Sequence, residues 1–247
     1  MPFSIIIPSR TAANLVPCIR AIREAGETAR IIVVDDGVDR SRHEWLKPDK
    51  PSISSEGAYF EPGVKPFVFA RNINIGIRAA GDDDVILLND DALLKTPMGF
   101  SHLARLAKEH NYFGILAPAC DTVGNPNQFR SWQPNVRNEP RMVCFVCVYI
   151  PRSTINSVGL LDERFIGYGL DDDDYCLRVR RAGLKIGIFD WCYVDHSSLK
   201  SSFRGEAGAG GDFSGNMKLF IEKWGVDNWG NPRETSRYAD LFPKEAA

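Results

Sequence analysis

Acidic side chains gather at two places in this sequence, and both arrangements could carry chemistry. Asn89, Asp90 and Asp91 follow the apolar run Val85–Leu88, whereas Asp171–Asp174 open a segment with the pattern of a helix. Carboxylate oxygens are ligands that divalent cations prefer, and a positioned carboxylate can also take a proton from a hydroxyl group. We interpret the first cluster as a metal holder and the second as the source of a general base.

The elements that would position these acids follow from the hydrophobic pattern. Phe3–Ile7, Ile31–Val34 and Val85–Leu88 are short, largely apolar runs, as expected for strands that are buried on both faces. Apolar residues at helical spacing separate these runs, from about Asn14 and again from Ala70 to Ala80. The alternation predicts parallel strands joined by right-handed crossovers, which is an α/β fold.

The order of strand and acid separates the clusters from one another. In an open parallel sheet, ligands bind beyond the carboxyl ends of the strands. Asp35 and Asp36 follow a strand, as do Asn89–Asp91, so we expect these residues at the ligand edge. Asp82–Asp84 precede a strand, so we expect a solvated turn at the opposite edge.

The rest of the chain shows no internal repeat. Pro17 is expected in the first turn of the first helix, where proline is tolerated. The remaining predictions are, in chain order, a long loop with short elements over 40–66, a helix over 100–110, a short strand over 114–119, a strand over 142–150, a helix over 171–182, short strands over 185–189 and 192–194, a mobile glycine-rich segment over 205–215 and an amphipathic helix over 217–224.

The composition is ordinary for a soluble globular protein. The 247 residues are 44% apolar and 25% charged, and the formal net charge is −2, so nucleic acid is not favoured as a partner. No stretch has the length of a membrane span and no leader precedes the first strand, so we expect a cytoplasmic protein. Six cysteines do not make a disulfide scaffold. Cys144 and Cys147 are expected as buried thiols, with a zinc or redox pair as the alternative.

Two residues are candidate ligands of Mn²⁺ or Mg²⁺. Asp91 ends the first cluster, and His196 follows a short predicted strand. A divalent ion that bridges two phosphates would stabilise the charge on a nucleoside diphosphate leaving group. The alternatives are a strand cap that begins a turn at Asn89–Asp91 and, for an isolated histidine, a role without a ligand.

Two further places could hold such a leaving group. Asp35 or Asp36 could accept a hydrogen bond from the imide of uracil or thymine. Arg71, followed by Asn72, could reach the diphosphate, because a guanidinium group matches phosphate oxygens. The alternatives are a receiver-like acidic pair or an Asx turn before Gly37, and an exposed helix arginine.

The cluster Asp171–Asp174 is the most specific local feature. A helix N-terminus offsets part of the mutual repulsion of four adjacent carboxylates. The aromatic and glycine residues of Phe165–Leu170 precede the cluster and could form the floor of an acceptor pocket. One carboxylate could then take the proton of an acceptor hydroxyl. The alternative is an acidic helix start that is balanced by Arg178, Arg180 and Arg181.

Several of these motifs together resemble one protein family. The motifs are Ile5-Ile6-Ile7-Pro8, Val33-Val34-Asp35-Asp36-Gly37, Leu87–Asp91 and Asp162–Gly183. They are similar to motifs of inverting family-2 glycosyltransferases with the GT-A fold. The resemblance runs from residue 3 to about residue 225 and includes the closing Lys223-Trp224-Gly225.

The resemblance implies roles for individual residues. Asp91 matches the last acid of a DxD-type metal motif, and His196 matches a histidine that often binds the metal in this family. Asp172 matches the second acid of a Glu-Asp pair, which is the family's catalytic base.

The chain also departs from the family pattern at some positions. Ser9-Arg10-Thr11 stand where the family has Tyr-Asn, Asp171 replaces the glutamate of the pair, and Asn89 replaces the first acid of the metal motif. Residues 40–66 have no counterpart in the pattern.

The resulting hypothesis is a metal-dependent, inverting glycosyltransferase that moves a sugar from a UDP- or dTDP-sugar to a glycan or another hydroxyl-bearing acceptor. We expect a single GT-A domain over 1–225 with a mainly parallel central sheet flanked by helices, and a C-terminal tail over 226–247 that packs on the domain or extends from it. The nucleotide-binding part would span about 1–95 and the acceptor-binding part about 96–225. Residues 205–215 would close over bound donor.

The predicted site residues form four groups. They are Pro8, Ser9, Arg10, Asp35, Asp36, Arg71, Asn72, Asn89 and Asp90 for the donor, Asp91 and His196 for the metal, Asp172 and Asp171 for catalysis, and Trp132, Asp162, Tyr168 and Gly169 for the acceptor.

Two other classes of protein remain as alternatives. A sugar-nucleotide pyrophosphorylase-like enzyme needs a glycine-rich loop after the first strand, and Pro8–Ala13 contains no glycine. The other class is a non-catalytic domain, either a nucleotide- or carbohydrate-binding domain or a receiver-like one. The chain has roughly twice the length of a typical receiver domain.

Overall fold

The computed structural model describes residues 2–41, 43, 46, 58–131, 133, 135–139, 141–166, 169–201 and 213–225. Its strands are β1 (Phe3–Ser9), β2 (Arg30–Asp35), β3 (Ala58–Pro62), β4 (Asp84–Leu88), β5 (Leu93–Leu94), β6 (Phe113–Cys120), β7 (Val136–Asn138), β8 (Cys147–Ile150) and β9 (Lys185–Asp195). Its helices are α1 (Ala12–Glu24), α2 (Phe69–Ala79), α3 (Gly99–Glu109), α4 (Arg152–Val158), α5 (Asp171–Arg181) and α6 (Phe213–Trp224), with a short 3₁₀ helix at Pro126–Gln128.

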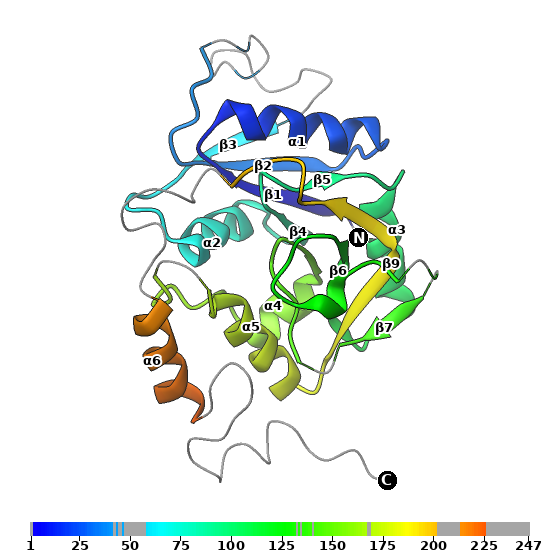
Figure 1. Ribbon diagram of the computed structural model, residues 1–247, viewed down its shortest axis with the longest axis vertical. Coiled ribbons are helices and arrows are strands. Elements are labelled where there is room, and N and C mark those ends of the chain that lie inside the picture. Colours follow the sequence, from blue (N-terminus) through cyan, green and yellow to red (C-terminus); the bar gives the residue numbers. More distant parts are fainter. Residues whose placement is uncertain are drawn as a thin grey trace.

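The strands form one mixed sheet with helices on both faces, which confirms the predicted α/β class (Figure 1). The strand order is β3-β2-β1-β4-β8-β6-β9-β5, and β7 pairs with β9. The predicted parallel arrangement holds for β1, β2 and β4, and β3, which was not predicted, also runs parallel to β2. β8 then runs antiparallel to β4 and to β6, whereas β9 runs parallel to β6.

These directions decide which loops share an edge. Two successive antiparallel pairings bring β6 back to the direction of β1, and β9 follows β6. The carboxyl ends of β1, β2, β4, β6 and β9 therefore lie at one edge of the sheet. β5 returns antiparallel to β9, with Leu93 opposite Asp195. This pairing brings the segment after β4 beside the end of β9.

The core has two layers because β1 and β2 carry apolar side chains on both faces. Ile5 and Ile7 pack with α1 and α3 on one face, whereas Ile6 packs with α2, α4 and α5 on the other. Gly76 lets α2 lie directly on the sheet, since a Cβ atom there would come within 2.3 Å of Cγ2 of Ile6.

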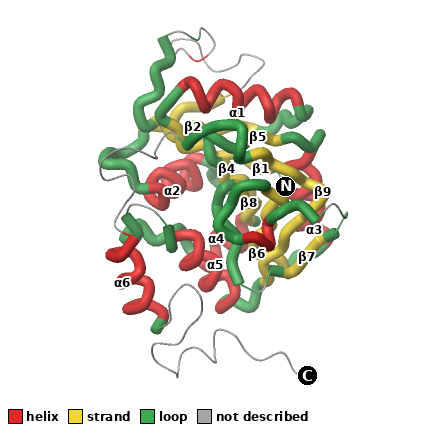
Figure 2. The backbone as a smooth tube through the Cα atoms, viewed as in Figure 1, coloured by secondary structure: helices red, strands yellow, loops and turns green. Residues whose placement is uncertain are grey.

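Helix α6 forms a third, smaller layer. Phe220 and Trp224 of α6 pack against Phe165, Leu170 and Leu177, the last of which belongs to α5. Figure 2 shows α6 on the side of α5 and away from β1–β4. The predicted glycine-rich lid lies outside the described residues over 205–212, and its last residues, 213–215, begin α6.

Several predicted boundaries were wrong. The strand predicted over 142–150 begins only at Cys147, although Val143 and Phe145 are as buried as strand residues. In this segment the apolar run therefore indicated burial but not strand pairing. The two short strands predicted over 185–194 are one strand, β9, with a register irregularity opposite Pro118 and Ala119. β3 was not predicted within the loop over 40–66.

Two local predictions also need correction. Helix α1 begins at Ala12 because the Thr11 side chain accepts the Asn14 N–H, so Pro17 lies inside the helix and not in its first turn. The expected solvated turn is wrong for Asp84, which is buried and accepts hydrogen bonds from the Tyr149 hydroxyl (2.5 Å) and the Arg152 N–H (2.7 Å).

The part of the chain that the structure describes contains no helix with the length and apolarity needed to cross a membrane. All six cysteines lie in this part and are free thiols; Cys144 is partly exposed and the others, Cys147 included, are buried. The division into a nucleotide-binding part and an acceptor-binding part, and the place of the tail over 226–247, stay predictions.

Candidate active site

Asp91 and His196 meet at the ligand edge. His196 Nε2 lies 3.2 Å from Asp91 Oδ1, and both side chains are largely buried. His196 Nδ1 lies 2.5 Å from the Thr122 carbonyl oxygen, which can only accept, so Nδ1 carries the proton. In the neutral ring, the Nε2 lone pair would face a carboxylate oxygen. Two acceptors at this distance need a shared cation, either a proton on Nε2 or a metal ion.

The backbone around His196 is also held in place. Its N–H donates to Asp121 Oδ1 at 2.9 Å, and Thr122 follows Asp121 in the loop after β6. Three strand ends, those of β4, β6 and β9, therefore build this corner. The sequence did not single out Asp121 or Thr122, and no motif marks them.

A carboxylate and an imidazole fit the ligand preferences of Mn²⁺, and a second ring nitrogen held by a carbonyl is the usual support of a metal-binding histidine. Among the described residues, no group of three or more His, Cys, Asp or Glu side chains could hold a metal ion. The pair would thus supply two protein ligands, and phosphate oxygens would have to complete the coordination.

Asp90 points away from this pair and into the junction of β1 and α1. Ser9 Oγ donates to its Oδ2 at 2.7 Å, and Asn14 Nδ2 lies 3.4 Å from its Oδ1. Asn14 also donates to the Lys200 carbonyl at 2.9 Å, which ties the segment after β9 to α1. Asp90 is 3% exposed. Its observed contacts position the loop, and its predicted role toward the donor stays a prediction.

The acids after β2 are divided between two environments. Asp35 Oδ1 accepts the N–H groups of Gly37 and Val38 at 2.9 and 2.7 Å, which is the Asx turn considered as the alternative. Asp36 is 6% exposed, and its N–H donates to the Ser9 carbonyl at 2.8 Å. Either carboxylate as a contact of the base stays a prediction.

The start of α2 also lies beside the ends of β2 and β3. Asn72 is fully buried, its Oδ1 accepts the Val64 N–H at 3.3 Å, and its Nδ2 has no hydrogen-bond partner among the described residues. Arg71 Nε lies 3.9 Å from Glu163 Oε2. Donor binding by Asn72 and Arg71 remains a prediction, as it does for Pro8, the buried penultimate residue of β1, for the partly exposed Arg10 that follows that strand, and for Asn89.

One residue that sequence reasoning missed joins α2 to the segment after α4. Asn74 of α2 is 1% exposed, donates to the Leu161 carbonyl at 2.9 Å and accepts the Leu161 N–H at 3.0 Å. It also donates to Glu163 at 2.9 Å. The available signal was a polar residue on the apolar face of a predicted helix, which is also true of Asn14.

The first acids of α5 form a group in which carboxylates face one another. Asp171 and Asp173 are 8% and 9% exposed, whereas Asp172 between them is partly exposed. Burial and the neighbouring Asp172 raise the pKa of Asp171 to about 8 and that of Asp173 to about 8. Burial also raises the pKa of Asp172, against which backbone N–H groups of Asp173 and Phe145 stabilise its anion.

Asp174 belongs to a different network. It is fully buried and accepts hydrogen bonds from Arg178 Nε at 2.9 Å, Lys223 Nζ at 2.6 Å and Trp224 Nε1 at 2.9 Å. The alternative of an acidic helix start balanced by arginine therefore describes Asp174 and not the three preceding acids. This network fixes α6 against α5.

The two acidic clusters lie at one edge, joined by the segment that precedes β8. Asn89 N–H donates to the Val146 carbonyl at 2.9 Å, and the adjacent Phe145 N–H bonds to Asp172. Gln128 is 1% exposed. Its Oε1 accepts the Cys144 N–H at 2.6 Å, and its Nε2 donates to the Cys144 carbonyl at 3.3 Å. Two adjacent backbone residues, Val146 and Phe145, thus contact the first and the second cluster.

The structure describes two of the four residues that were predicted to bind the acceptor. Trp132 and Tyr168 lie outside the described residues. Asp162 is bound by Arg164 at 2.6 Å and Lys223 at 2.9 Å, and the Arg164 hydrogen bonds hold the pKa of its carboxyl well below the usual range. Gly169 has φ +88°, and its carbonyl accepts Asn216 Nδ2 at 2.8 Å. Acceptor binding by these residues stays a prediction.

A family model described as Glycosyl transferase family 2 matches residues 4–157. The chain belongs to this family. The match includes the first acidic cluster and ends before α5 and His196.

The fold is that of known GT-A transferases. GalNAc-T7, in a crystal structure with UDP, GalNAc and Mn²⁺, superposes with a TM-score of 0.65 at 11% identity, over 79% of this chain and 44% of that one. TarS of S. aureus gives 0.61 at 13% identity, over 92% and 40%. The mannosyltransferase PcManGT of Pyrobaculum calidifontis, in complex with GDP-Man and Mn²⁺, gives 0.60 at 16% identity, over 82% and 58%.

A relative by sequence is an uncharacterized protein, y4gI, of Sinorhizobium fredii. It is 25% identical over 228 aligned residues, which cover 80% of this chain and 24% of the relative. The chain therefore spans about a quarter of that relative and from 40% to 58% of the three structures.

Proposed function

We propose that this protein is a metal-dependent, inverting glycosyltransferase that uses a nucleoside diphosphate sugar. The observation that carries the proposal is the approach of His196 Nε2 to Asp91 Oδ1, 3.2 Å, at the edge where the strand ends meet. Family membership and the fold support glycosyl transfer, and two of the similar structures were determined with Mn²⁺.

The donor side would bind the nucleotide diphosphate. Asp91 and His196 would hold a divalent ion, which supplies positive charge to stabilise the diphosphate as it leaves. The free amide donor of Asn72, which is buried beside the ends of β2 and β3, would contribute a hydrogen bond to the nucleotide. Asp35 or Asp36 would contact the base, for which uracil or thymine offers an imide N–H.

The acceptor side would supply the base, and Asp172 is the best candidate among the three acids. It is more exposed than Asp171 and Asp173, and two backbone N–H groups stabilise its anion. Its neighbours keep their protons near neutral pH, because their pKa values are about 8. Burial also raises the pKa of Asp172, which makes its carboxylate a stronger proton acceptor.

The transfer follows from this placement. Asp172 takes the proton of the acceptor hydroxyl, the hydroxyl oxygen forms a bond to the anomeric carbon, and the bond from that carbon to the diphosphate oxygen breaks. Attack from the face opposite the leaving group inverts the anomeric configuration in one displacement. The electron pair of the broken bond leaves on the diphosphate.

A panel of nucleotide sugars tests the proposal. Thermal unfolding is followed with UDP-, dTDP- and GDP-sugars, each with Mn²⁺ and with EDTA. A matching donor at a hundredfold excess over its Kd should raise Tm by roughly 5–10 °C with Mn²⁺ and less with EDTA. Nucleotide release is then measured with the donor that binds. Equal Tm values for every donor, with and without Mn²⁺, would contradict the proposal.

A further inference from the structure

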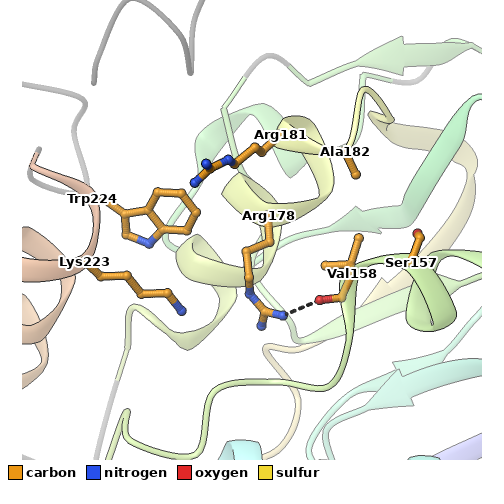
Figure 3. A pocket seen from close by; sticks show the side chains of 7 residues that line it. All are labelled: Ser157, Val158, Arg178, Arg181, Ala182, Lys223 and Trp224. Carbon is orange, nitrogen blue, oxygen red and sulfur yellow. Dashed lines mark hydrogen bonds between the residues drawn. The ribbon is translucent and has the colours of Figure 1, made fainter. Parts of the chain in front are cut away.

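A pocket lies between α4, the end of α5 and the end of α6. It has a volume of about 400 Å³, and Val158, Arg178, Arg181, Lys223 and Trp224 are among the residues that line it (Figure 3). Arg181 is the last residue of α5, and Asp171 is the first. Arg178 and Arg181 follow Asp172 by six and nine residues, so at 1.5 Å per residue the pocket is about 9–14 Å along the helix from the proposed base.

The lining of this pocket is strongly cationic. Arg178, Arg181 and Lys223 contribute three positive side chains, and the described residues that line the pocket include no carboxylate. The buried Asp174 behind it pairs with Arg178 and Lys223, and Asp162 also pairs with Lys223. Arg181 makes no ion pair with the described residues and is exposed. Positive charge is thus left at the pocket itself.

Arg178 carries an unused donor edge. Its Nε binds Asp174, and its Nη1 donates to the Val158 and Leu160 carbonyls at 3.1 and 2.9 Å. Its Nη2 is buried and has no hydrogen-bond partner among the described residues. The Arg178 guanidinium also lies over the Tyr175 ring, with Cζ 4.7 Å from the ring centroid. Among the described residues, Nη2 therefore has an aromatic neighbour but no oxygen acceptor, which an anion that reached it would supply.

The indole of Trp224 is 4% exposed and lines the pocket with the part of its surface that the core leaves uncovered. Its Nε1 donates to Asp174 at 2.9 Å, which holds the ring in one orientation. Figure 3 shows that Trp224 and Lys223 come from α6 and that Arg178 and Arg181 come from α5. Cations with a rigid aromatic face suit a molecule that carries both an anionic group and a flat or apolar body.

We propose that this pocket binds a phosphorylated small molecule, with the phosphate at Arg178, Arg181 and Lys223 and its organic body against Trp224. A phosphate offers several oxygens and up to two charges, which match three separate cations better than a single carboxylate does. That charge must also overcome the partial negative charge of the α5 C-terminus, which the two arginines offset. The site is separate from the proposed donor site.

The test follows the indole N–H signal of Trp224 in ¹⁵N-tryptophan-labelled full-length protein, assigned with Trp224→Phe. The protein is titrated at constant ionic strength with inorganic phosphate, with a hexose phosphate and with sodium chloride. A saturable shift with phosphate alone indicates an anion site, and a tighter one with the hexose phosphate indicates that the indole contacts the sugar. Chloride should give no saturable shift.

Arg181 variants make the test specific. Arg181→Gln should weaken phosphate binding about tenfold and Arg181→Glu more, since each removes a charged hydrogen-bond donor. Arg105→Glu, an exposed arginine of α3 with a side chain 68% exposed, is the matched control and should bind like wild type. Asp91→Ala, at the other site, should also bind like wild type.

Three outcomes would overturn the proposal. The first is a Trp224 signal that does not respond to phosphate or the hexose phosphate, as expected if the chain after residue 225 fills the pocket. The second is equal affinity in the wild type and in Arg181→Glu. The third is loss of the shift in Asp91→Ala, which would place the phosphate at the proposed donor site.

Discussion

The acids at the strand ends and the acids at the start of α5 are the same residue type in opposite electrostatic conditions. At the strand ends, donors face the carboxylates of Asp90 and Asp195. Ser9 Oγ donates to Asp90 at 2.7 Å. Burial alone would raise the pKa of Asp195, but hydrogen bonds from Ser197 and Ser198 outweigh burial and lower this pKa to about 2. At the start of α5, Asp171 and Asp173 face Asp172, and their pKa values rise to about 8.

The difference shows that the partners of a carboxylate, and not its residue type, decide what it can do. A carboxylate surrounded by donors is a permanent anion near neutral pH and can support a cation site. A group of buried carboxylates shares protons, so one of them can accept another proton when a substrate arrives. The fold places both conditions at one edge, joined by the backbone of Phe145 and Val146.

The largest effect is expected for Asp172→Asn. The amide keeps the size of the side chain and cannot take a proton, so nucleotide release should fall by about 10²–10⁴-fold. Donor binding should remain unchanged, because the donor side is not altered. Turnover is measured as nucleotide release with Mn²⁺, and binding by calorimetry. Asp82→Asn, an exposed acid at the opposite edge, serves as control. Near-normal turnover of Asp172→Asn would remove Asp172 as the base.

Asp91→Ala tests the strand-end side of the comparison. Loss of one of two protein ligands should weaken Mn²⁺-dependent donor binding by at least about tenfold. Binding in EDTA should be the same in the variant and in the wild type. Calorimetry with the donor in Mn²⁺ and in EDTA measures both values, with Asp82→Ala as the matched control. A variant that keeps the full Mn²⁺ effect would exclude Asp91 as a ligand.

Asp173→Asn tests whether the acids at the start of α5 hold protons in the folded protein. A raised folded-state pKa means that the folded protein keeps a proton that the unfolded chain loses near the ordinary value of 3.8. Stability should therefore fall as pH rises toward about 8, by about 1.4 kcal/mol per pH unit for each such group. In the variant, the unfolding free energy should depend less steeply on pH, by the contribution of one such group. Urea unfolding between about pH 5 and pH 7.5 measures it, and parallel slopes would argue that Asp173 is ionised in the folded state.

The smallest effect compares two serines at opposite ends of β1. Ser9→Ala removes the 2.7 Å hydrogen bond to buried Asp90, and should cost about 1–3 kcal/mol of unfolding free energy. Ser4→Ala removes an equally short hydrogen bond to Asp83, which is more exposed and can bind water instead. Denaturant unfolding of both variants gives the difference. Equal losses would show that burial of Asp90 adds nothing.

Much of the fold could be predicted because its signals are local. Continuous apolar runs identified β1, β2 and β4, and helical spacing identified α2, α3 and α5 within one or two residues. The segment over 142–146 shows the limit of such signals. Val143, Phe145 and Val146 are buried like strand residues, but the backbone of this segment is held by Gln128 and Asn89 instead of a ladder. Which partner a backbone finds is a non-local property.

The candidate site divides along the same line. That Asp91 lies at the carboxyl edge follows from strand order alone, because every parallel strand delivers the loop after it to that edge. His196 reaches Asp91 only because β5 pairs antiparallel with β9, more than ninety residues later in the chain. Asp35, by contrast, is engaged in a local turn that residue type made available.

The sequence by itself determined the α/β order of elements, the edge at which the acids of the strand loops gather and the acidic start of α5. Only the tertiary structure decided which of those acids meet hydrogen-bond donors and which meet one another. The physical reason is range. Hydrophobic periodicity acts between residues a few positions apart, whereas the charge state of a buried carboxylate depends on whatever groups the folded chain brings within a few ångströms of it.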